Sequence, residues 1–310
     1  MIGITLGEYL GIGPEILLKT YADLQDNLPP CRIYGSRQLL EQKANELDIR
    51  HFWEEEPHEL VETFKGSVAD GDTKSRAEYV LSTLNQSIQD AKSGEISSIV
   101  TCPIDKSVIQ HLIPTFTGHT EYLAEKSGVE KTVMMLNNKE FSIALLTNHV
   151  SLRNVSNKLT QYGVEETIQT AAKSLSRHFL IRDPKIALLG LNPHAGELDS
   201  QSEEKTVFLP VMEKLKSQGL DIQGPFPADS FFAKARSQKW DLVLSPFHDQ
   251  GLVAAKYNGL ENVINVTLGM PFLRISPGHG VAYDIAKKNI ADHRSLKRCI
   301  QVILKKDLCL

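Results

Sequence analysis

Short apolar segments alternate with helical segments along most of this chain, and this alternation limits its folds more than any other feature. The predicted strands lie near residues 1–6, 31–34, 96–100 and 185–191. A helix is predicted over residues 75–93, where apolar residues recur at helical spacing. Strands that alternate with helices in this way predict an α/β sandwich with a largely parallel sheet.

One region interrupts the alternation. Residues 132–136 and 141–147 flank the polar segment Asn137–Glu140 and predict a β-hairpin, which marks a second unit with antiparallel pairing. The segment Gly224–Asp229 contains two prolines and predicts a rigid turn. No repeat or Pro/Ser-rich linker separates the two units, so we expect them to pack closely.

The stretch Asp241–Asp284 concentrates chemically reactive side chains. Its apolar run at residues 242–244 leads into His248-Asp249-Gln250-Gly251. This segment is followed by Lys256, Asn265 and Arg274, which are spaced nine residues apart, and then by Gly278-His279-Gly280. Polar groups directly after a buried strand are costly unless they bind something. We therefore expect this stretch to contribute to a binding site.

Three histidines suggest a metal site. His149, His194 and His248 each follow an apolar strand segment. A single histidine in such a place is more often exposed or hydrogen-bonded than a ligand, but the ends of parallel strands meet at one sheet edge. Three imidazoles suit Zn²⁺ or another borderline divalent metal and leave a position open for substrate. Asp249 either binds the metal or orients a ligand.

Basic side chains predict an anion site. His119 and Thr120 stand at a helix start, whose free N–H groups attract anions; the alternative is a Thr120 cap beside an exposed histidine. Lys256 and Arg274 could hold a phosphate or carboxylate. Lys106 follows another predicted strand and is either a ligand-binding residue at the sheet edge or a lysine exposed to solvent. A metal beside an anion pocket fits a substrate that has both a phosphate and a hydroxyl group. The pocket would bind the phosphate, and the metal would lower the pKa of the hydroxyl.

A glycine turn follows the first predicted strand. Gly11 and Gly13 allow a tight turn, and Pro14 suits the first helical position. Glu15 falls in the first turn, where the helix dipole favours an acid. Open α/β sheets bind ligands at such strand-to-helix loops. The alternative is a plain turn, since short glycine patterns are weak signals.

Charge and composition narrow the choice of partners. The net charge of −4 gives no reason to expect nucleic acid or an anionic membrane. The four cysteines lack metal-ligand spacing, which favours reduced thiols. No signal-like start is present, and no apolar run approaches the roughly 18 residues of a membrane span. We expect a soluble, cytoplasmic protein.

Together these segments resemble the 4-hydroxythreonine-4-phosphate dehydrogenase family of vitamin B6 biosynthesis. The blocks that carry the resemblance run in order along nearly the whole chain: GIGPE, TCPIDK, TGHTE, LLTNHVSL, GLNPHAGE, GPFPADSFF, FHDQGL and VTLGMPFLRIS. The resemblance implies the two-domain α/β sandwich of isocitrate and isopropylmalate dehydrogenases, with the active site in the interdomain cleft. It implies a cofactor-side domain at residues 1–125 and 267–310, and a metal, substrate and dimerisation domain at residues 126–266.

The resemblance also implies a role for each site residue. The implied metal ligands, for Zn²⁺, Mg²⁺ or Co²⁺, are His149, His194 and His248. In the family this site is shared across a homodimer, one histidine coming from the partner subunit. The implied substrate contacts are His119, Thr120, Lys256, Asn265 and Arg274. The implied contacts to NAD or NADP are Gly11, Gly13, Glu15, His279 and Gly280. The candidate catalytic residues are Lys256, as general base, and Asp249.

The implied reaction is NAD(P)-dependent oxidation of the C3 hydroxyl of 4-phosphohydroxy-L-threonine. Its 3-oxo acid product decarboxylates to 3-amino-2-oxopropyl phosphate, in pyridoxal 5'-phosphate biosynthesis. Three alternatives stay open. One is a relative acting on 4-phospho-threonate or 4-phospho-erythronate. Another is a hydrolase in which the histidines and an aspartate activate water. The third is a relative that binds phosphorylated ligands but has impaired cofactor use.

Three segments depart from the family's pattern. Glu8-Tyr9-Leu10 stands where Asp-Pro-Ala is usual, and Leu198-Asp199-Ser200 replaces glycines in a shorter connection. Gly278-His279-Gly280-Val281 stands where Asp-His-Gly-Thr is usual. None of these changes touches the predicted metal or substrate residues. They cluster where the resemblance puts the nicotinamide cofactor, and they predict a change in cofactor affinity or in the choice between NAD and NADP.

Overall fold

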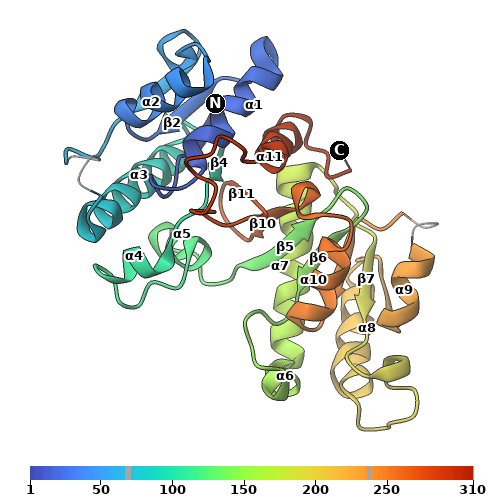
Figure 1. Ribbon diagram of the computed structural model, residues 1–310. Helices are drawn as coiled ribbons and strands as arrows, with labels where there is room; N and C mark the ends of the chain where they lie inside the picture. The colour runs from blue at the N-terminus through green and yellow to red at the C-terminus, as the bar shows by residue number, and fades with distance from the viewer. Residues whose placement is uncertain (67–70, 236–238, 310) are drawn as a thin grey trace. The chain divides into compact units, whose positions relative to one another are not determined.

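The computed structural model describes residues 1–66, 71–235 and 239–309, which form two compact α/β units (Figure 1). Unit 1 contains Met1–Glu130 and Met270–Lys305. Unit 2 contains Lys131–Gly269, together with the residues that follow Lys305. The predicted α/β class is confirmed, with both parallel and antiparallel strand pairs. The two-domain sandwich type with an active site in an interdomain cleft stays a prediction.

Unit 1 is built on parallel strands. They run in the order β3-β2-β1-β4-β11, and neighbouring strands pair parallel. These strands are β1 (Ile2–Thr5), β2 (Cys31–Tyr34), β3 (Glu59–Val61), β4 (Ser98–Thr101) and β11 (Leu273–Pro277). The helices are α1 (Gly13–Leu24), α2 (Arg37–Leu47), α3 (Thr73–Ser93), α4 (Lys106–Gln110), α5 (His119–Ser127) and α11 (Arg294–Lys305).

The helix predicted at residues 75–93 is α3, and its start has a clear physical cause. The side chain of Asp72 accepts hydrogen bonds from the backbone N–H groups of Lys74 (3.0 Å) and Ser75 (3.1 Å), which is an N-cap. Its apolar face packs on a core that includes Tyr34 and Ile99. Strands β1 and β4 are buried along their whole length, as expected for parallel strands covered by helices.

Unit 2 combines parallel and antiparallel strands in the order β10-β5-β6-β9-β7-β8. These strands are β5 (Val133–Asn137), β6 (Ser142–Leu145), β7 (Ile186–Leu189), β8 (Ile222–Phe226), β9 (Leu242–Ser245) and β10 (Ile264–Leu268). The predicted hairpin is confirmed, because β5 and β6 pair antiparallel. The α-helices are α6 (Leu152–Lys158), α7 (Gln161–Phe179), α8 (Leu209–Ser217), α9 (Ala228–Ala235) and α10 (His248–Lys256).

One local prediction is wrong. The segment predicted as a rigid turn, Gly224–Asp229, instead supplies the end of strand β8 and the start of helix α9. Strand β8 pairs with β7 alone and stands last in the strand order of unit 2. An edge strand tolerates proline, because its missing N–H is not needed by a second neighbour.

Helix α10 lies beside β6 in unit 2 (Figure 1). At Gly251 a Cβ atom would stand 2.9 Å from Cγ2 of Ile143 and 3.0 Å from Cβ of Ser245. Only glycine allows this close approach, while Leu252 and Ala255 are buried in the same core. The first residues of α10 are therefore held at the carboxyl ends of β6 and β9.

In the described part of the chain, none of the helices combines the length and the apolar character that a membrane crossing needs.

Candidate active site

Two of the three predicted metal ligands are neighbours in unit 2. His149 follows β6, and His248 begins α10 directly after β9; β6 and β9 are adjacent parallel strands. The centroids of the two imidazole rings are 5.6 Å apart. Nδ1 of His248 lies 2.7 Å from Oδ1 of Asp249. An Nδ1–H that donates to this carboxylate leaves Nε2 with a lone pair for a metal, the orienting role predicted for Asp249.

His194 lies in the turn after β7, at the same end of the sheet, because β7 and β9 are parallel neighbours. Its side chain is exposed, like that of His149. Among the described residues, the only three ligand atoms of His, Cys, Asp or Glu within 4.8 Å of one another belong to Glu41, His51 and Glu54. One copy of the chain therefore brings His149 and His248 together without closing a three-histidine set.

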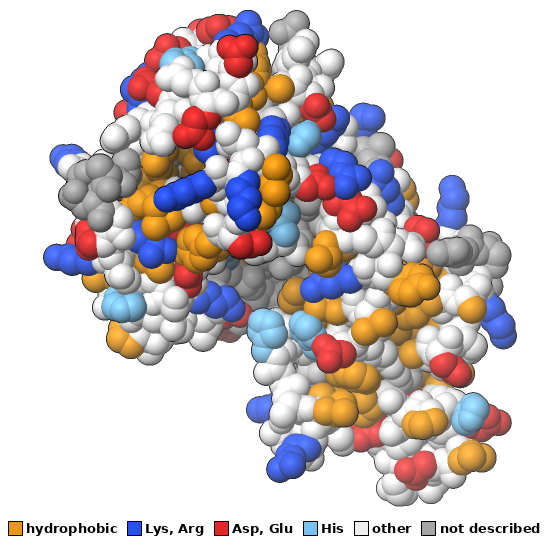
Figure 2. All heavy atoms as spheres, viewed as in Figure 1, with side chains coloured by type: hydrophobic (Ala, Val, Ile, Leu, Met, Phe, Trp, Pro, Cys, Tyr) orange, Lys and Arg blue, Asp and Glu red, His pale blue; other side chains and the backbone are white. Residues whose placement is uncertain are grey.

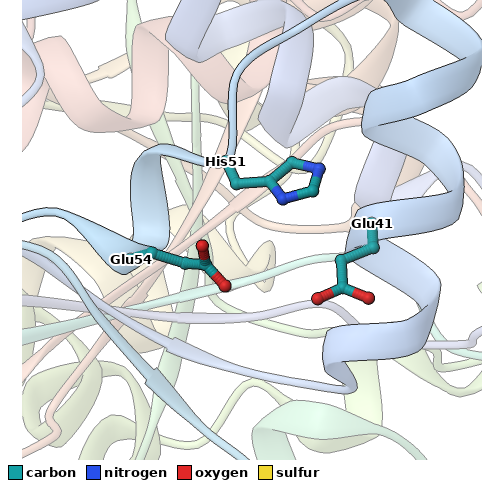
Figure 3. A group of neighbouring side chains, drawn as sticks. All are labelled: Glu41, His51 and Glu54. Carbon is teal, nitrogen blue, oxygen red and sulfur yellow. The ribbon is translucent and has the colours of Figure 1, made fainter.

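The group Glu41, His51 and Glu54 lies in unit 1, where its side chains converge from α2 and the segment after it (Figure 3). Arg37 forms an ion pair with Glu54, and its Nη1 lies 3.9 Å from Oε1 of Glu41. His51 stacks on Trp53. The acids thus already have a cation, so an ion-paired surface cluster accounts for this arrangement.

A group of basic side chains gathers at the start of helix α5 in unit 1. Arg274, on β11, is 3% exposed, and its Nη2 donates to Oγ1 of Thr101 on β4 at 2.7 Å. Burial lowers the pKa of Arg274 to about 10. Nε2 of His119, the first residue of α5, is buried without a hydrogen-bond partner. Burial, followed by the charges of Arg274 and Lys106, holds the pKa of His119 well below its usual range.

Lys106 completes this basic group. A Cβ atom built on Gly118, the N-cap of α5, would stand 3.4 Å from Nζ of Lys106 and 3.2 Å from Oε2 of Glu121. Glu121 is thus the acid beside two cations and a buried imidazole. Cationic side chains at a helix N-terminus are suited to a doubly charged anion such as a phosphate monoester. Thr120 follows His119 in the first turn of α5.

Lys256 and Asn265 lie in unit 2. Lys256 is the last residue of α10, so its Cα lies roughly 12 Å from that of His248 at 1.5 Å per residue. The lysine side chain is half-buried. Asn265 lies on β10, and its Oδ1 is buried without a hydrogen-bond partner. That oxygen is an acceptor that a ligand with an N–H or O–H group could satisfy.

The predicted cofactor residues lie in unit 1. At Gly13 a Cβ atom would stand 1.9 Å from the carbonyl oxygen of Leu6, so the turn requires glycine there. Oε1 of Glu15 accepts hydrogen bonds from the backbone N–H of Ala291 and from Lys19, both at 2.7 Å. Glu15 therefore already ties α1 to the segment after β11.

The other predicted cofactor residues lie around that segment. Nε2 of His279 is buried without a partner, and burial lowers the pKa of this histidine. Gly280 has open space where a side chain would stand. At Gly11, by contrast, a Cβ atom would stand 2.6 Å from Cγ1 of Val281. The glycine loop thus packs closely on the segment after β11.

Comparison with known proteins identifies the family of this chain. A family model described as "Pyridoxal phosphate biosynthetic protein PdxA" matches residues 27–303. The chain is 36% identical over 332 residues to 4-hydroxythreonine-4-phosphate dehydrogenase of Neisseria meningitidis serogroup A, covering 98% of this chain and 97% of that one.

This chain belongs to the PdxA family.

Further PdxA-family likenesses extend over the whole fold. The relative named 4-hydroxythreonine-4-phosphate dehydrogenase in Marinobacter nauticus is 35% identical, covering 97% of this chain and 94% of that one. The crystal structure of the Klebsiella pneumoniae protein of that name matches with a TM-score of 0.84 at 27% identity, covering 99% of each chain. The predicted family is confirmed, and with it an oxidoreductase of pyridoxal phosphate biosynthesis.

Glu8, one of the departures from the PdxA pattern, belongs to a polar network in unit 1. Glu8 is 1% exposed, and its Oε1 accepts a hydrogen bond from Nε of Arg76 at 2.9 Å. Nη2 of Arg76 donates to the hydroxyl of Tyr283 at 2.5 Å, and that hydroxyl donates to Oδ2 of Asp105 at 2.8 Å. Burial, followed by the bond to Asp105, raises the pKa of Tyr283. The network ties the loops after β1, β4 and β11 to α3.

Sequence reasoning missed some residues of these groups. The position of Lys106 after a strand fits both a ligand-binding lysine and a solvated one, so the sequence alone does not decide between them. Arg76 and Tyr283 gave no signal, since an arginine in a polar helix and a tyrosine in a loop are ordinary residues there. Each acquires its role from a partner that is distant in the chain.

Proposed function

We propose that this chain is a metal-dependent, NAD(P)-linked dehydrogenase that oxidises the C3 hydroxyl of 4-phosphohydroxy-L-threonine. The 3-oxo acid so formed would lose CO₂ to give 3-amino-2-oxopropyl phosphate. The PdxA-family relatives that carry this activity in their names match over nearly their full length. The observation that carries the proposal is the basic group of Lys106, His119 and Arg274.

The basic group is proposed to bind the phosphate of the substrate. Arg274 is almost fully buried, so a bond between its guanidinium and a phosphate would be shielded from bulk water. An anion there would accept hydrogen bonds from the Arg274 guanidinium and from Nε2 of His119, which has no partner now. Thr120 adds a hydroxyl at the helix start. A dianion would also favour the protonated form of His119, so binding would take up a proton.

The histidines of unit 2 are proposed to bind a divalent metal, with Zn²⁺, Mg²⁺ and Co²⁺ as candidates. The neighbouring imidazoles of His149 and His248 and the carboxylate that orients His248 fit such an ion. Bound there, a metal supplies Lewis-acid stabilisation for charge on the substrate oxygen, while NAD(P) supplies the hydride acceptor. Lys256 is proposed to take the proton of the hydroxyl. Asn265 is proposed to accept a hydrogen bond from the substrate through its unpartnered Oδ1.

A second copy of the chain is proposed to complete the metal site with its own histidine, in a homodimer. One copy alone brings together only two of the three histidines. Next to Asp249, a cavity of about 660 Å³ is lined by apolar side chains including Phe141, Phe232 and Val253. Helix α10 also exposes Val253 (69%) and Tyr257 (85%), and hydrophobic side chains gather on this face of unit 2 (Figure 2). An exposed apolar patch beside an incomplete site favours a partner copy.

NAD or NADP is proposed to bind the loops after β1 and β11 in unit 1. The fit rests on two buried polar atoms without partners, Nε2 of His279 and Oε2 of Glu8, and on the open space at Gly280. Gly11 and Gly13 keep the first loop close to its neighbours, and Glu15 holds the segment that carries His279. In this region Arg76 already bonds to Glu8 and to Tyr283, and Asp105 bonds to Tyr283. These existing bonds support altered cofactor selectivity.

The deciding experiment is an assay of NAD⁺ and NADP⁺ reduction with 4-phosphohydroxy-L-threonine, with and without Zn²⁺, Mg²⁺ or Co²⁺. The proposal expects NADH or NADPH formation that requires both metal and nucleotide. Release of inorganic phosphate without a nucleotide would instead indicate a hydrolase. Calorimetry that detects metal and substrate binding but no NAD(P) binding would indicate a ligand-binding relative. Faster turnover of 4-phospho-threonate or 4-phospho-erythronate would indicate that one of these acids is the substrate in place of 4-phosphohydroxy-L-threonine.

A further inference from the structure

The turn that carries His194 has a backbone that its own residues do not favour. His194 (φ 54°), Ala195 (φ 52°) and Gly196 (φ 70°) all adopt the left-handed region. Residues other than glycine enter this region rarely and at an energetic cost. The side chain of His194 is exposed, so its own packing does not impose the conformation. Contacts from elsewhere must hold the turn.

The carboxylate of Glu204 provides such contacts to the residues just before the turn. Glu204 is 1% exposed, and its Oε1 accepts hydrogen bonds from two successive backbone N–H groups, of Leu191 (2.7 Å) and Asn192 (2.8 Å). Its Oε2 accepts a third hydrogen bond from Nδ2 of Asn192 at 2.9 Å. A buried carboxylate satisfied by three donors of one segment fixes both the backbone and the side chain of that segment.

The turn also closes tightly around this carboxylate. A Cβ atom at Gly196 would stand 2.4 Å from Oε2 of Glu204, and one at Gly190 would stand 3.1 Å from Oε1 and 2.8 Å from Cα of Ala195. Glu204 is also the first residue of a π-helical turn, Glu204–Phe208. Such turns are rare and often occur at functional sites.

The same segment is tied to the helix that begins with His248. Nε2 of Gln250 on α10 donates to the carbonyl oxygen of Gly190 at 2.8 Å. Oγ of Ser245, at the end of β9, donates to Oε1 of Gln250 at 2.9 Å and so orients its amide. The histidine turn is therefore held at its start by α10 and on its inner side by Glu204.

We propose that Glu204 is a positioning residue that holds the His194 turn in its metal-binding conformation. It thereby sets the affinity and the coordination geometry of the metal without touching the ion. This inference rests on the proposed metal role of His194. Carboxylates that support metal ligands in this indirect way typically change metal affinity when they are substituted.

The test is Glu204→Gln, which keeps the size of the side chain but turns one acceptor oxygen into an NH₂ donor. That donor would face an N–H group of Leu191 or of Asn192. We expect Zn²⁺ affinity, measured by competition with a chelator, to fall about 10-fold to 100-fold. We also expect the visible absorption of the Co²⁺-loaded protein to change, because this spectrum reports coordination geometry.

Glu203→Gln is the matched control. Glu203 accepts hydrogen bonds from Nδ2 of Asn192 and from Ser156, but from no backbone group of the turn. Its substitution should leave Zn²⁺ affinity within about threefold and the Co²⁺ spectrum unchanged. If Glu204→Gln does not unfold cooperatively, Glu204→Asp takes its place. It keeps the charge but is one methylene too short to hold the turn, so the same losses are expected.

Two outcomes separate this inference from the proposed function. A wild-type protein that binds metal and a Glu204→Gln protein of equal affinity and spectrum would overturn the positioning role alone. A wild-type protein that binds no divalent metal would overturn the proposed metal site. In that case hydrogen exchange of the metal-free proteins still tests whether Glu204 fixes the backbone of the His194 turn. Unchanged exchange at the Leu191 and Asn192 amides of Glu204→Gln would refute it as well.

Discussion

Replacing Arg274 by methionine should separate binding from stability. In the ligand-free protein its pKa falls from the ordinary 12.5 to about 10 through burial, which corresponds to roughly 3 kcal/mol. Methionine is unbranched, replaces the apolar part of the arginine side chain and has no charge to bury. The lost hydrogen bond to Thr101 costs about 1 kcal/mol. The ligand-free Arg274→Met protein should therefore be as stable as the wild type, or more stable by up to about 2 kcal/mol.

Binding should change in the opposite direction. A hydrogen bond between ionised groups contributes about 1.5–3 kcal/mol, so kcat/KM for a phosphorylated substrate should fall roughly 10-fold to 150-fold. Urea unfolding of the ligand-free protein measures the first effect, and calorimetry with inorganic phosphate together with steady-state kinetics measures the second. Arg294→Met, an exposed arginine paired with Asp292, is the control and should change neither. Unchanged phosphate affinity, or a stability loss above about 2 kcal/mol, would refute this account of Arg274.

Three further predictions follow from the described groups. His194→Ala should abolish metal binding, measured as metal content after dialysis, without lowering the Tm of the metal-free protein, because the side chain is exposed. Wild-type metal content in this variant would contradict the site. Because the pKa of His119 lies well below 6.5, this group is neutral near pH 7 and a bound dianion should protonate it. Sulfate binding should thus strengthen as pH falls from about 8 to 6. Calorimetry in two buffers should detect the accompanying proton uptake. Equal uptake in the His119→Asn protein would show that His119 is not the group that takes up the proton. Tyr283→Phe removes the hydroxyl between Arg76 and Asp105 and should weaken NAD(P) binding several-fold, whereas the exposed Tyr162→Phe should not.

Local patterns predicted the elements well where the cause is local. The spacing of apolar residues at 75–93 predicts helix α3 because an amphipathic helix must bury one face, whatever that face contacts. The polar segment 137–140 between two apolar runs predicts the β5–β6 hairpin for a similar reason. The sequence did not predict strand β8, because its prolines favour a turn. They are compatible with a strand only at the edge of the sheet, and the strand order shows that β8 lies there.

The candidate site was predictable only as a set of residue types. Histidines and cations after apolar segments identified His119, His149, His248 and Arg274 as candidates. The sequence contained no comparable signal for Glu204, because a buried carboxylate that accepts backbone N–H groups 12 and 13 residues away looks like any acid at a helix start. The polar network around Tyr283 was equally hidden, since its members come from four separate segments.

The sequence by itself determined the alternating elements, the family and the side chains placed at the ends of strands. The tertiary structure decided which of those side chains meet. His149 and His248 are far apart in the chain, yet their rings lie 5.6 Å apart because β6 and β9 pair side by side. Arg274 reaches Thr101 because β11 pairs with β4. The order of strands in a sheet depends on how all the helices and strands bury their apolar faces together, and no single segment of the chain contains that information.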